Sequence, residues 1–148
     1  MKKDIRDTMI ESGYYMPIIF GILMLILFSG FKLTAQTPEQ VFNECVKQGI
    51  KHPEIVTKQA ILETGNFECI NCSLDHNNLF GFRWKGKYLE FDSWQESVAY
   101  YKKWQQKWFK GEKQYFDFLE CIYVHRDGRC QRYAESEDYI YKLKQIEL

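Results

Sequence analysis

Beyond the first 35 residues, apolar residues recur mainly three or four positions apart, which is the spacing of amphipathic helices. The segment 37–40 has the composition of a helix start, with Thr37 as the cap, a proline in the first turn and a glutamine that can reach back. An apolar stripe follows and stops at Gly49, and Pro53 opens a second stripe that stops at Gly65. The sequence therefore predicts two short helices, each ended by a glycine.

The pattern changes to alternation between Phe80 and Trp84, where aromatic residues occupy every second position. Lys85 and Gly86 then give a turn signal, and the segment KYLEF that follows has the composition of a second strand. One short β-hairpin is therefore predicted, inserted after the second helix.

Helical spacing returns after this hairpin. The segment 93–96 has the composition of a capping box, and the apolar positions behind it continue to Gly111. A further helix is predicted from Tyr115 through Tyr123, then a turn over 125–131 and a last helix with Ser136 as its cap. The inward positions of this last helix are Tyr139, Ile140, Leu143 and Ile146. The predicted fold class is thus α+β and mostly α, with one small β-hairpin lobe.

The N-terminal segment has a different composition. Residues 12–31 carry no charge, the middle of this run is almost continuously apolar, and basic residues precede it. This is the pattern of an export signal, with Ala35 as a cleavage point. The run also has about the ~20 residues that span a bilayer, so an uncleaved membrane anchor is an alternative, and a buried core helix is a third. In the first two interpretations the chain divides into 1–35, a signal peptide or anchor, and 36–148, a folded domain in the periplasm or at the cell surface.

The charge and the aromatic content of the chain indicate which classes of partner to expect. The chain has 20 basic and 20 acidic residues, so it carries no net charge and gives no indication of a nucleic-acid partner. Aromatic residues make up 17% of the chain, which suits both a core and a cleft that stacks on sugar rings. We expect a monomer that needs no cofactor.

The cysteines are consistent with an exported protein, because disulfides persist in oxidising compartments. The local pairings are Cys121 with Cys130 and Cys69 with Cys72, which leave Cys45 over. A zinc site made of four cysteines is the alternative, but eight residues separate Cys121 from Cys130, a poor match to the usual short spacing. We therefore expect disulfides and no metal.

Glu63 is the candidate for acid chemistry. It shares one helix face with Val56 and Ala60, and this face is apolar up to the carboxyl. Desolvation raises the pKa of a carboxyl among apolar groups, so that it stays protonated at higher pH. Such an acid can donate a proton to the leaving oxygen of a glycosidic bond. The alternative is an exposed residue in the last turn of a helix.

Four segments in order, QAILETGNFE, NNLFGFRW, FDSWQESVAYY and RYAESEDYIYKL, resemble the bacterial glucosaminidases of glycoside hydrolase family 73. This family contains the peptidoglycan-cleaving autolysins and the flagellar-rod glucosaminidase. The resemblance covers roughly residues 38–146. It implies a lysozyme-like fold, peptidoglycan glycan strands as the partner, and hydrolysis of the β-1,4 bond after N-acetylglucosamine.

The resemblance also implies roles for particular residues. Glu63 corresponds to the general acid and Tyr133 to an active-site tyrosine. The cleft-forming loop corresponds to Asn78, Leu79, Phe80 and Gly81.

Each of these residues also has a structural interpretation. The Asn78 amide could bind an acetamido or hydroxyl group of a sugar, or satisfy turn backbone instead. Phe80 could line the cleft or belong to the core. Tyr133 could steady the transition state or the acetamido group, or pack with its hydroxyl satisfied inside the protein.

A second carboxylate is harder to identify. Glycosidases usually place a base or a nucleophile opposite the acid. Glu90 in the hairpin is the first candidate, and Asp75 and Asp92 are others; the alternative for Glu90 is an outward strand position on a solvated face. The acetamido group of the substrate could also act as the nucleophile.

Two other functions stay open. A lytic transglycosylase related to lysozyme needs one acid and no attacking water, which fits a single identified carboxyl. A glycan-binding module without turnover would keep the cleft, although simple binding has no use for the buried acid Glu63.

Overall fold

The structure is a computed structural model that describes residues 36–111 and 113–148. The predicted signal peptide or anchor, residues 1–35, lies outside the described residues. Among the helices that are described, none combines the length and the apolar character needed to cross a membrane.

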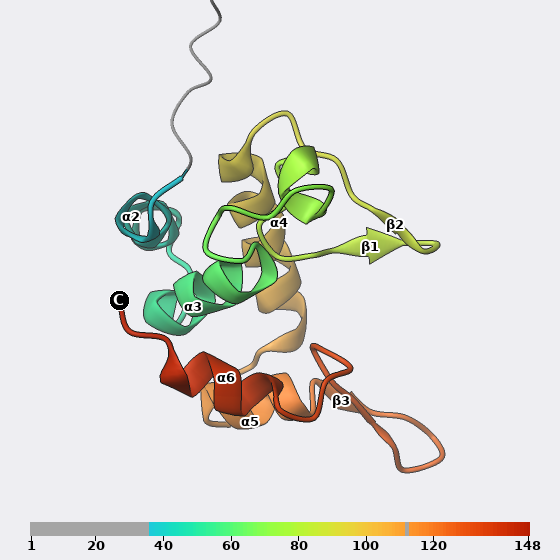
Figure 1. Ribbon diagram of the computed structural model, residues 1–148. Coiled ribbons are helices and arrows are strands. Elements are labelled where there is room, and N and C mark those ends of the chain that lie inside the picture. Colours follow the sequence, from blue (N-terminus) through green and yellow to red (C-terminus); the bar gives the residue numbers. More distant parts are fainter. Residues whose placement is uncertain (1–35, 112) are drawn as a thin grey trace, which may run out of the picture. The chain divides into compact units, whose positions relative to one another are not determined.

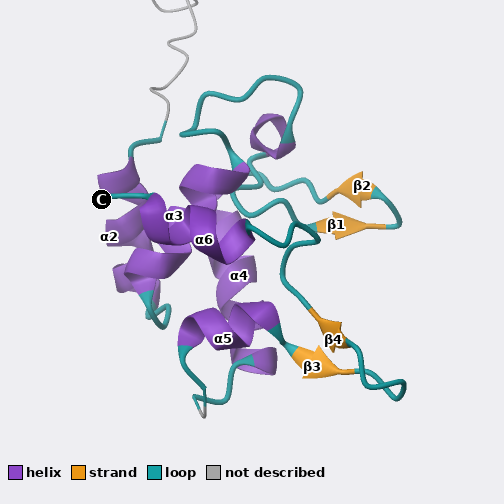
Figure 2. Ribbon diagram, turned by 60° about the horizontal axis from the view of Figure 1, so that its bottom comes forward, coloured by secondary structure: helices purple, strands orange, loops and turns teal. Residues whose placement is uncertain are grey.

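The described chain is mainly helical, with two small antiparallel sheets (Figures 1 and 2). The helices are α2 (Pro38–Gln48), α3 (Pro53–Glu63), α4 (Trp94–Trp108), α5 (Tyr115–Glu120) and α6 (Tyr139–Gln145), with a short 3-10 helix η2 (Ser73–His76). The strands are β1 (Arg83–Trp84) paired with β2 (Lys87–Tyr88), and β3 (Tyr123–Val124) paired with β4 (Cys130–Gln131). Both hairpins project from the same side of the helices (Figure 1). The predicted fold class, α+β and mostly α, is confirmed.

The first two helices form largely as predicted. The Gln40 backbone N–H donates to Thr37 Oγ1 at 3.2 Å, and Gln40 Oε1 accepts from the Thr37 N–H at 3.1 Å, which completes the capping box. Gly49 caps the C-terminus of α2 with a left-handed backbone, φ 73°. Helix α3 ends one residue earlier than expected, because its C-terminal cap is Thr64 and not Gly65. The Thr64 hydroxyl donates to the carbonyl of Ala60 at 2.6 Å.

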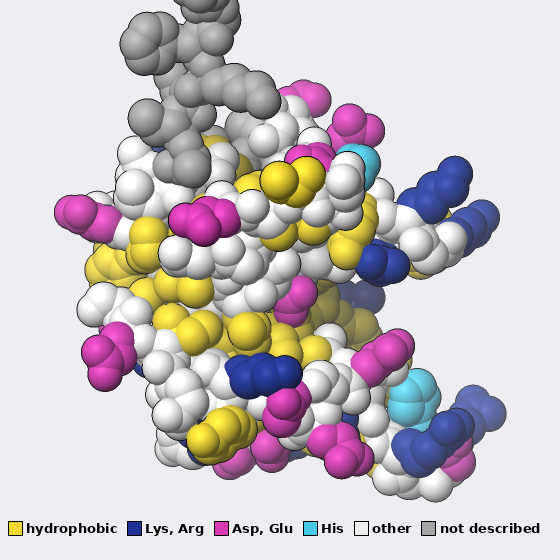
Figure 3. All heavy atoms as spheres, viewed as in Figure 1, with side chains coloured by type: hydrophobic (Ala, Val, Ile, Leu, Met, Phe, Trp, Pro, Cys, Tyr) yellow, Lys and Arg dark blue, Asp and Glu magenta, His cyan; other side chains and the backbone are white. Residues whose placement is uncertain are grey.

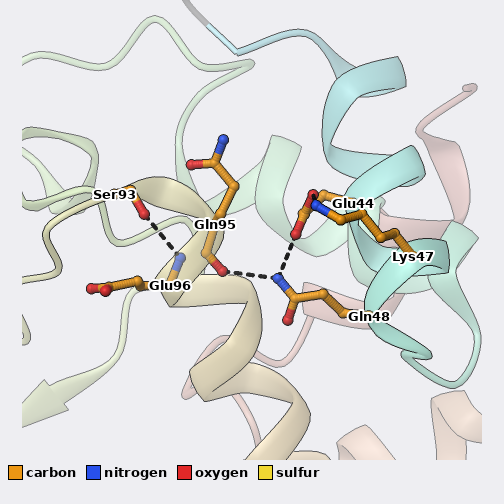
Figure 4. A network of polar contacts seen from close by, with 6 residues as sticks. All are labelled: Glu44, Lys47, Gln48, Ser93, Gln95 and Glu96. Atoms are coloured by element: carbon orange, nitrogen blue, oxygen red, sulfur yellow. Dashed lines mark hydrogen bonds and ion pairs between the residues drawn. The ribbon is translucent and has the colours of Figure 1, made fainter.

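Helix α2 is tied to the start of α4 by side chains (Figure 4). The Gln48 Nε2 donates to the carbonyl of Gln95 at 3.1 Å. Ser93 accepts from the Glu96 N–H at 3.3 Å, as predicted for a cap. The Glu96 carboxylate, however, accepts from the N–H of Asp92, so the expected capping box is only half formed.

The C-terminal region departs from the prediction. Helix α5 stops at Glu120, and the segment predicted as helix through Tyr123 enters the β3–β4 hairpin. The run 122–124 is aromatic and β-branched, which suits a strand, and Gly128 supplies the left-handed turn, φ 83°. Ser136 was predicted to cap the last helix, but Asp138 holds that position and accepts a hydrogen bond from the Ser136 hydroxyl. There are thus two β-hairpins in the described chain instead of one.

The core lies between the helices. Helix α2 packs against α3 and α4, and α6 packs against α3 and α5. The largest fully buried side chains of this core include Tyr101, Tyr115, Leu79, Leu119 and Leu143. Two tyrosines among them carry hydroxyl groups that need partners inside the protein.

Two disulfides are present, and they join the cysteines of both predicted local pairs, Cys69–Cys72 and Cys121–Cys130. These bonds use the four thiols that the zinc alternative would have required. Cys45 is a free cysteine, fully buried on α2.

Candidate active site

A cleft of about 940 Å³ lies between the two hairpins. Figure 3 shows the surface hollowed at this place, with Lys and Arg side chains gathered toward both hairpin tips. Its wall includes the end of α3, the segments 80–83 and 131–136, and side chains of α4 and α6. Its aromatic lining consists of Phe80, Phe82, Tyr88, Trp104, Trp108, Tyr123, Tyr133 and Tyr139. Such a lining suits a ligand with extended apolar faces, as sugar rings have.

Glu63 lies in the wall of this cleft, at the last residue of α3. Its Oε1 accepts a hydrogen bond from the Tyr139 hydroxyl at 3.0 Å. Its Oε2 lies beside Gly81, where an added Cβ would come within 2.8 Å of it. Gly81 also has a left-handed backbone, φ 65°, which favours glycine, and any side chain there would displace the Glu63 carboxyl.

The electrostatic surroundings of Glu63 favour its neutral form. Burial raises the pKa of the carboxyl above its usual value, and this is the largest effect. The hydrogen bond from Tyr139 and the charge of Arg83 lower the pKa, but by less. The group is therefore protonated at higher pH than an exposed glutamate, as the apolar helix face predicts.

Tyr133 connects the two sides of the site. Its hydroxyl donates to the carbonyl of Phe80 at 2.9 Å, and its ring stacks on Tyr139 with centroids 5.7 Å apart. The ring lines the cleft, and burial raises the pKa of the hydroxyl well above its ordinary value. The tyrosine thus contributes its ring to the cleft wall while its hydroxyl holds the loop that carries Phe80 and Gly81.

Asn78 is fully buried and does not belong to the cleft lining. Its Nδ2 donates to the carbonyls of Phe82 at 2.8 Å and Leu89 at 3.0 Å, and its Oδ1 accepts from the Phe82 N–H at 3.1 Å. Both amide hydrogens are used by the backbone, which agrees with the structural interpretation of this residue. Asn78 therefore builds the loop at the base of the first hairpin.

Phe80 fulfils both interpretations given from the sequence. It is buried, with its ring centroid 4.4 Å from that of Tyr101, and it also forms part of the cleft wall. Leu79 is fully buried in the core.

The structure does not bring the candidate second carboxylates together with Glu63. Glu90, Asp75 and Asp92 are exposed, and none of them is part of the cleft lining. Asp75 accepts a hydrogen bond from the Cys72 N–H at the start of η2. Among the cleft-lining residues, the carboxylate besides Glu63 is Glu135, which sequence reasoning missed although it lies within the quoted segment RYAESEDY.

Sequence reasoning also missed two residues that act on Glu63, one by a hydrogen bond and one by its charge. Tyr139 was expected to point inward, but nothing in the pattern shows that its hydroxyl reaches Glu63, because 76 positions separate the two residues. Arg83 was assigned to a strand, and its charge acts on Glu63 across the cleft wall.

The arrangement is suited to acid chemistry on a sugar. Within the described part of the chain, no three His, Cys, Asp or Glu side chains gather as a metal site would require. The cleft presents a carboxyl with a raised pKa, aromatic walls, and the cations Arg83, Arg132 and Lys142. A protonated carboxyl in such a wall can deliver a proton to a bound glycosidic oxygen.

Comparison with known families gives the same conclusion. The glucosaminidase family model, described as mannosyl-glycoprotein endo-beta-N-acetylglucosaminidase, matches residues 39–147. No curated protein and no solved structure gives a significant match. The matched region contains the whole cleft, including Glu63 and Tyr133. The chain therefore belongs to the glucosaminidase family, glycoside hydrolase family 73, and is a glycoside hydrolase with a role in cleaving peptidoglycan.

Proposed function

We propose that the protein hydrolyses the β-1,4 bond after N-acetylglucosamine in peptidoglycan, with Glu63 as the general acid. One observation carries the proposal: the carboxyl of Glu63 lies in the cleft wall, and burial raises its pKa. A carboxyl with a raised pKa keeps its proton at higher pH than an ordinary glutamate, so it can act as an acid over a wider pH range.

The proposed reaction begins when a glycan strand lies in the cleft with its scissile oxygen beside Glu63. The carboxyl donates its proton to this oxygen as the bond from the anomeric carbon to the oxygen breaks. The other sugar leaves with a hydroxyl group, and water adds to the anomeric carbon. This carbon becomes a new reducing end on N-acetylglucosamine, and the proton released from the water restores the acid.

The loop residues act around this acid. Gly81 lets the loop approach Glu63, and the Phe80 ring forms part of the wall. The Tyr133 ring is proposed to contact the sugar, since it lines the same cleft as Glu63 and Phe80. Asn78 contributes by holding the loop, because its amide is bonded to the backbone.

The base or nucleophile is the second part of the proposal. Glu135 is the better candidate on position, because it lines the cleft, whereas Glu90 is exposed outside the lining. The acetamido group of the substrate is the remaining candidate, since it needs no second carboxylate.

The two disulfides support an extracytoplasmic location, because cytosolic thiols are normally kept reduced. Peptidoglycan also lies outside the cytoplasm. We therefore propose that the domain acts in the periplasm or at the cell surface.

The test is mass spectrometry of purified peptidoglycan after incubation with the wild-type protein, Glu63→Gln or Glu90→Gln. We expect new reducing N-acetylglucosamine ends with the wild type, and a loss of roughly 10²- to 10⁴-fold with Glu63→Gln, because the amide has no proton to donate in this way. Glu90→Gln is the matched control, since it makes the same change on an exposed carboxylate.

Other results would redirect the proposal. A comparable loss with Glu90→Gln would make Glu90 the second carboxylate. Anhydro-muramic ends would identify a lytic transglycosylase. Binding to peptidoglycan without any product from the wild type would leave a glycan-binding module and exclude Glu63 as an acid.

A further inference from the structure

We propose that a one-directional chain of hydrogen bonds through the core holds the proton of Glu63 on Oε2, the oxygen beside Gly81. The inference rests on the proposed role of Glu63 as the acid, and it adds which oxygen carries the proton and why. The members of the chain come from α3, α4, α5 and α6 (Figure 1). They are, in order from the far side of the core, Gln105, Tyr115, Tyr101, Gln59 and Tyr139.

The chain is continuous and buried. Its members are at most 8% exposed. The successive distances are 2.8 Å from Gln105 Nε2 to Tyr115 Oη, 2.7 Å from Tyr115 Oη to Tyr101 Oη, 2.6 Å from Tyr101 Oη to Gln59 Oε1, 3.4 Å from Gln59 Nε2 to Tyr139 Oη, and 3.0 Å from Tyr139 Oη to Glu63 Oε1. Burial of polar groups is costly unless every one is paired, so the arrangement of the hydrogens is constrained.

The direction is set at the far end by backbone. The Lys51 N–H donates to Gln105 Oε1 at 2.7 Å, and the Lys51 carbonyl accepts from Gln105 Nε2 at 2.8 Å. A backbone N–H can only donate and a backbone carbonyl can only accept, so the amide of Gln105 has one orientation. Its second N–H therefore points at Tyr115, whose oxygen must accept.

The direction then passes along the chain. Because Tyr115 accepts from Gln105, its own hydrogen is directed to Tyr101. Tyr101 in turn donates to Gln59 Oε1, which leaves Gln59 Nε2 facing Tyr139. Reversal would place the N–H of Gln105 against the O–H of Tyr115, two donors without an acceptor.

The consequence appears at the acid. Since Tyr139 receives an N–H from Gln59, its single hydrogen goes to Glu63 Oε1. An oxygen that already accepts this hydrogen bond is the carbonyl oxygen of the protonated acid, so the proton lies on Oε2. That oxygen adjoins Gly81 of the cleft wall. The chain thus aims the proton to the side where the substrate is proposed to bind.

The tyrosines remain donors over the working range, because burial raises the pKa of Tyr101 and of Tyr139 well above the ordinary value. The charge of Arg83 of β1 also lowers the pKa of the acid, and the charge of Glu63 in turn raises the pKa of Tyr133, which precedes α6. The remaining ionisable side chains of the cleft are Tyr88, Tyr123, Glu135, Arg132 and Lys142. The variants below alter none of these groups.

The test frees the amide of Gln59 without touching the cleft. In Tyr101→Phe the Gln59 amide loses the hydrogen that orients it, so its oxygen can turn toward Tyr139 and compete for that hydroxyl. In Tyr115→Phe a hydroxyl is also removed, one step earlier in the chain, but Tyr101 still has Gln59 as its acceptor. In the double variant Tyr101→Phe with Gln59→Leu, the competing amide is absent and Tyr139 can donate only to Glu63.

The first readout is a carbon-13 NMR titration of the Glu63 carboxyl, assigned by its absence in Glu63→Gln. Because the hydrogen bond from Tyr139 lowers the pKa of Glu63, we expect the titration of Tyr101→Phe to move to higher pH. Tyr115→Phe should titrate as the wild type, and the double variant should return toward it. A titration of Tyr101→Phe at the same pH as that of the wild type would overturn the proposal.

The second readout is the pH dependence of kcat on a soluble glycan fragment. We expect Tyr101→Phe to lower kcat about fivefold, the equivalent of one hydrogen bond, with KM unchanged and the alkaline limb moved to higher pH. A titration that moves without the alkaline limb would support the chain and refute Glu63 as the acid. Thermal unfolding of each variant separates these effects from loss of folded protein.

Discussion

The two hairpins beside the cleft have equally short strands, but they are attached to the helices in different ways. The β1–β2 and β3–β4 sheets each pair two residues with two residues, which is too little to be stable alone. At its base the first is joined to the helical part by hydrogen bonds, three of them from the buried Asn78 amide, whereas the base of the second is closed by the Cys121–Cys130 disulfide. One short hairpin beside the cleft is thus fixed by non-covalent bonds, and the other by a covalent bond.

The two kinds of attachment differ in what they depend on. The Asn78 amide makes three hydrogen bonds to the backbone, and all are formed by folding alone. The disulfide needs an oxidising compartment. It is supplemented by the Trp108 and Tyr123 rings, stacked with centroids 5.0 Å apart. The first hairpin should therefore be sensitive to a single substitution, and the second to the redox state.

The largest effect is expected from Asn78→Ala. It leaves two carbonyls and one N–H of the hairpin base without their buried partner, and we expect a loss of about 3–5 kcal/mol in the free energy of unfolding. Denaturant unfolding measures it. The control is Asn77→Gly, which removes one hydrogen bond at the adjacent position, where φ is 52° and suits glycine. Equal losses for the two variants would refute the special role of Asn78.

An intermediate effect is expected when the second hairpin loses its disulfide. The bond closes a loop with a sequence separation of 9, for which chain entropy gives roughly 2.5–3 kcal/mol. We therefore expect the double variant Cys121→Ser with Cys130→Ser to lower the melting temperature, and to lose amide protection over 121–131 in hydrogen exchange.

The control for this disulfide is the other one. Cys69→Ser with Cys72→Ser opens a loop with a separation of only 3, so its entropic effect should be smaller. Protection over 83–88 should be unchanged when Cys121 and Cys130 are replaced, because the first hairpin does not depend on oxidation. Loss of protection in both hairpins would show that they are held as one unit.

The smallest effect is expected from Arg83→Gln in the first hairpin. The charge of Arg83 lowers the pKa of Glu63, so its removal should raise that pKa. A general acid works in its protonated form, and the alkaline limb of the pH–rate profile should therefore move to higher pH. Stability should change little, since the residue is exposed. Lys87→Gln, an equal charge change on β2 outside the cleft lining, should leave the profile in place.

Much of the helical part could be predicted because its signals are local. The Thr37 cap and Gly49 lie within a few residues of the groups they satisfy. The β3–β4 hairpin could not be predicted in this way, since the short apolar run 122–124 fits a helix or a strand equally well. The partner strand and the disulfide decide between them, and both lie several residues away.

The same distinction between local and distant signals applies to the candidate site. The raised pKa of Glu63 follows from the apolar face of its own helix, so sequence alone indicates it. The approach of Tyr139 to Glu63 depends on how distant segments pack. Side chains at sequence separations of tens of residues meet only in the folded chain, and periodicity contains no information about which atoms face each other.

The buried thiol of Cys45 has a consequence for how this protein can be handled. Burial raises its pKa to about 12, so almost no thiolate forms at neutral pH, and thiolate is the species that attacks disulfides and alkylating reagents. The native chain therefore cannot reshuffle its own disulfides through its fifth cysteine. Under non-reducing conditions, alkylation by a thiol reagent should occur only when α2 opens, and its rate then reports spontaneous opening of the core without any denaturant.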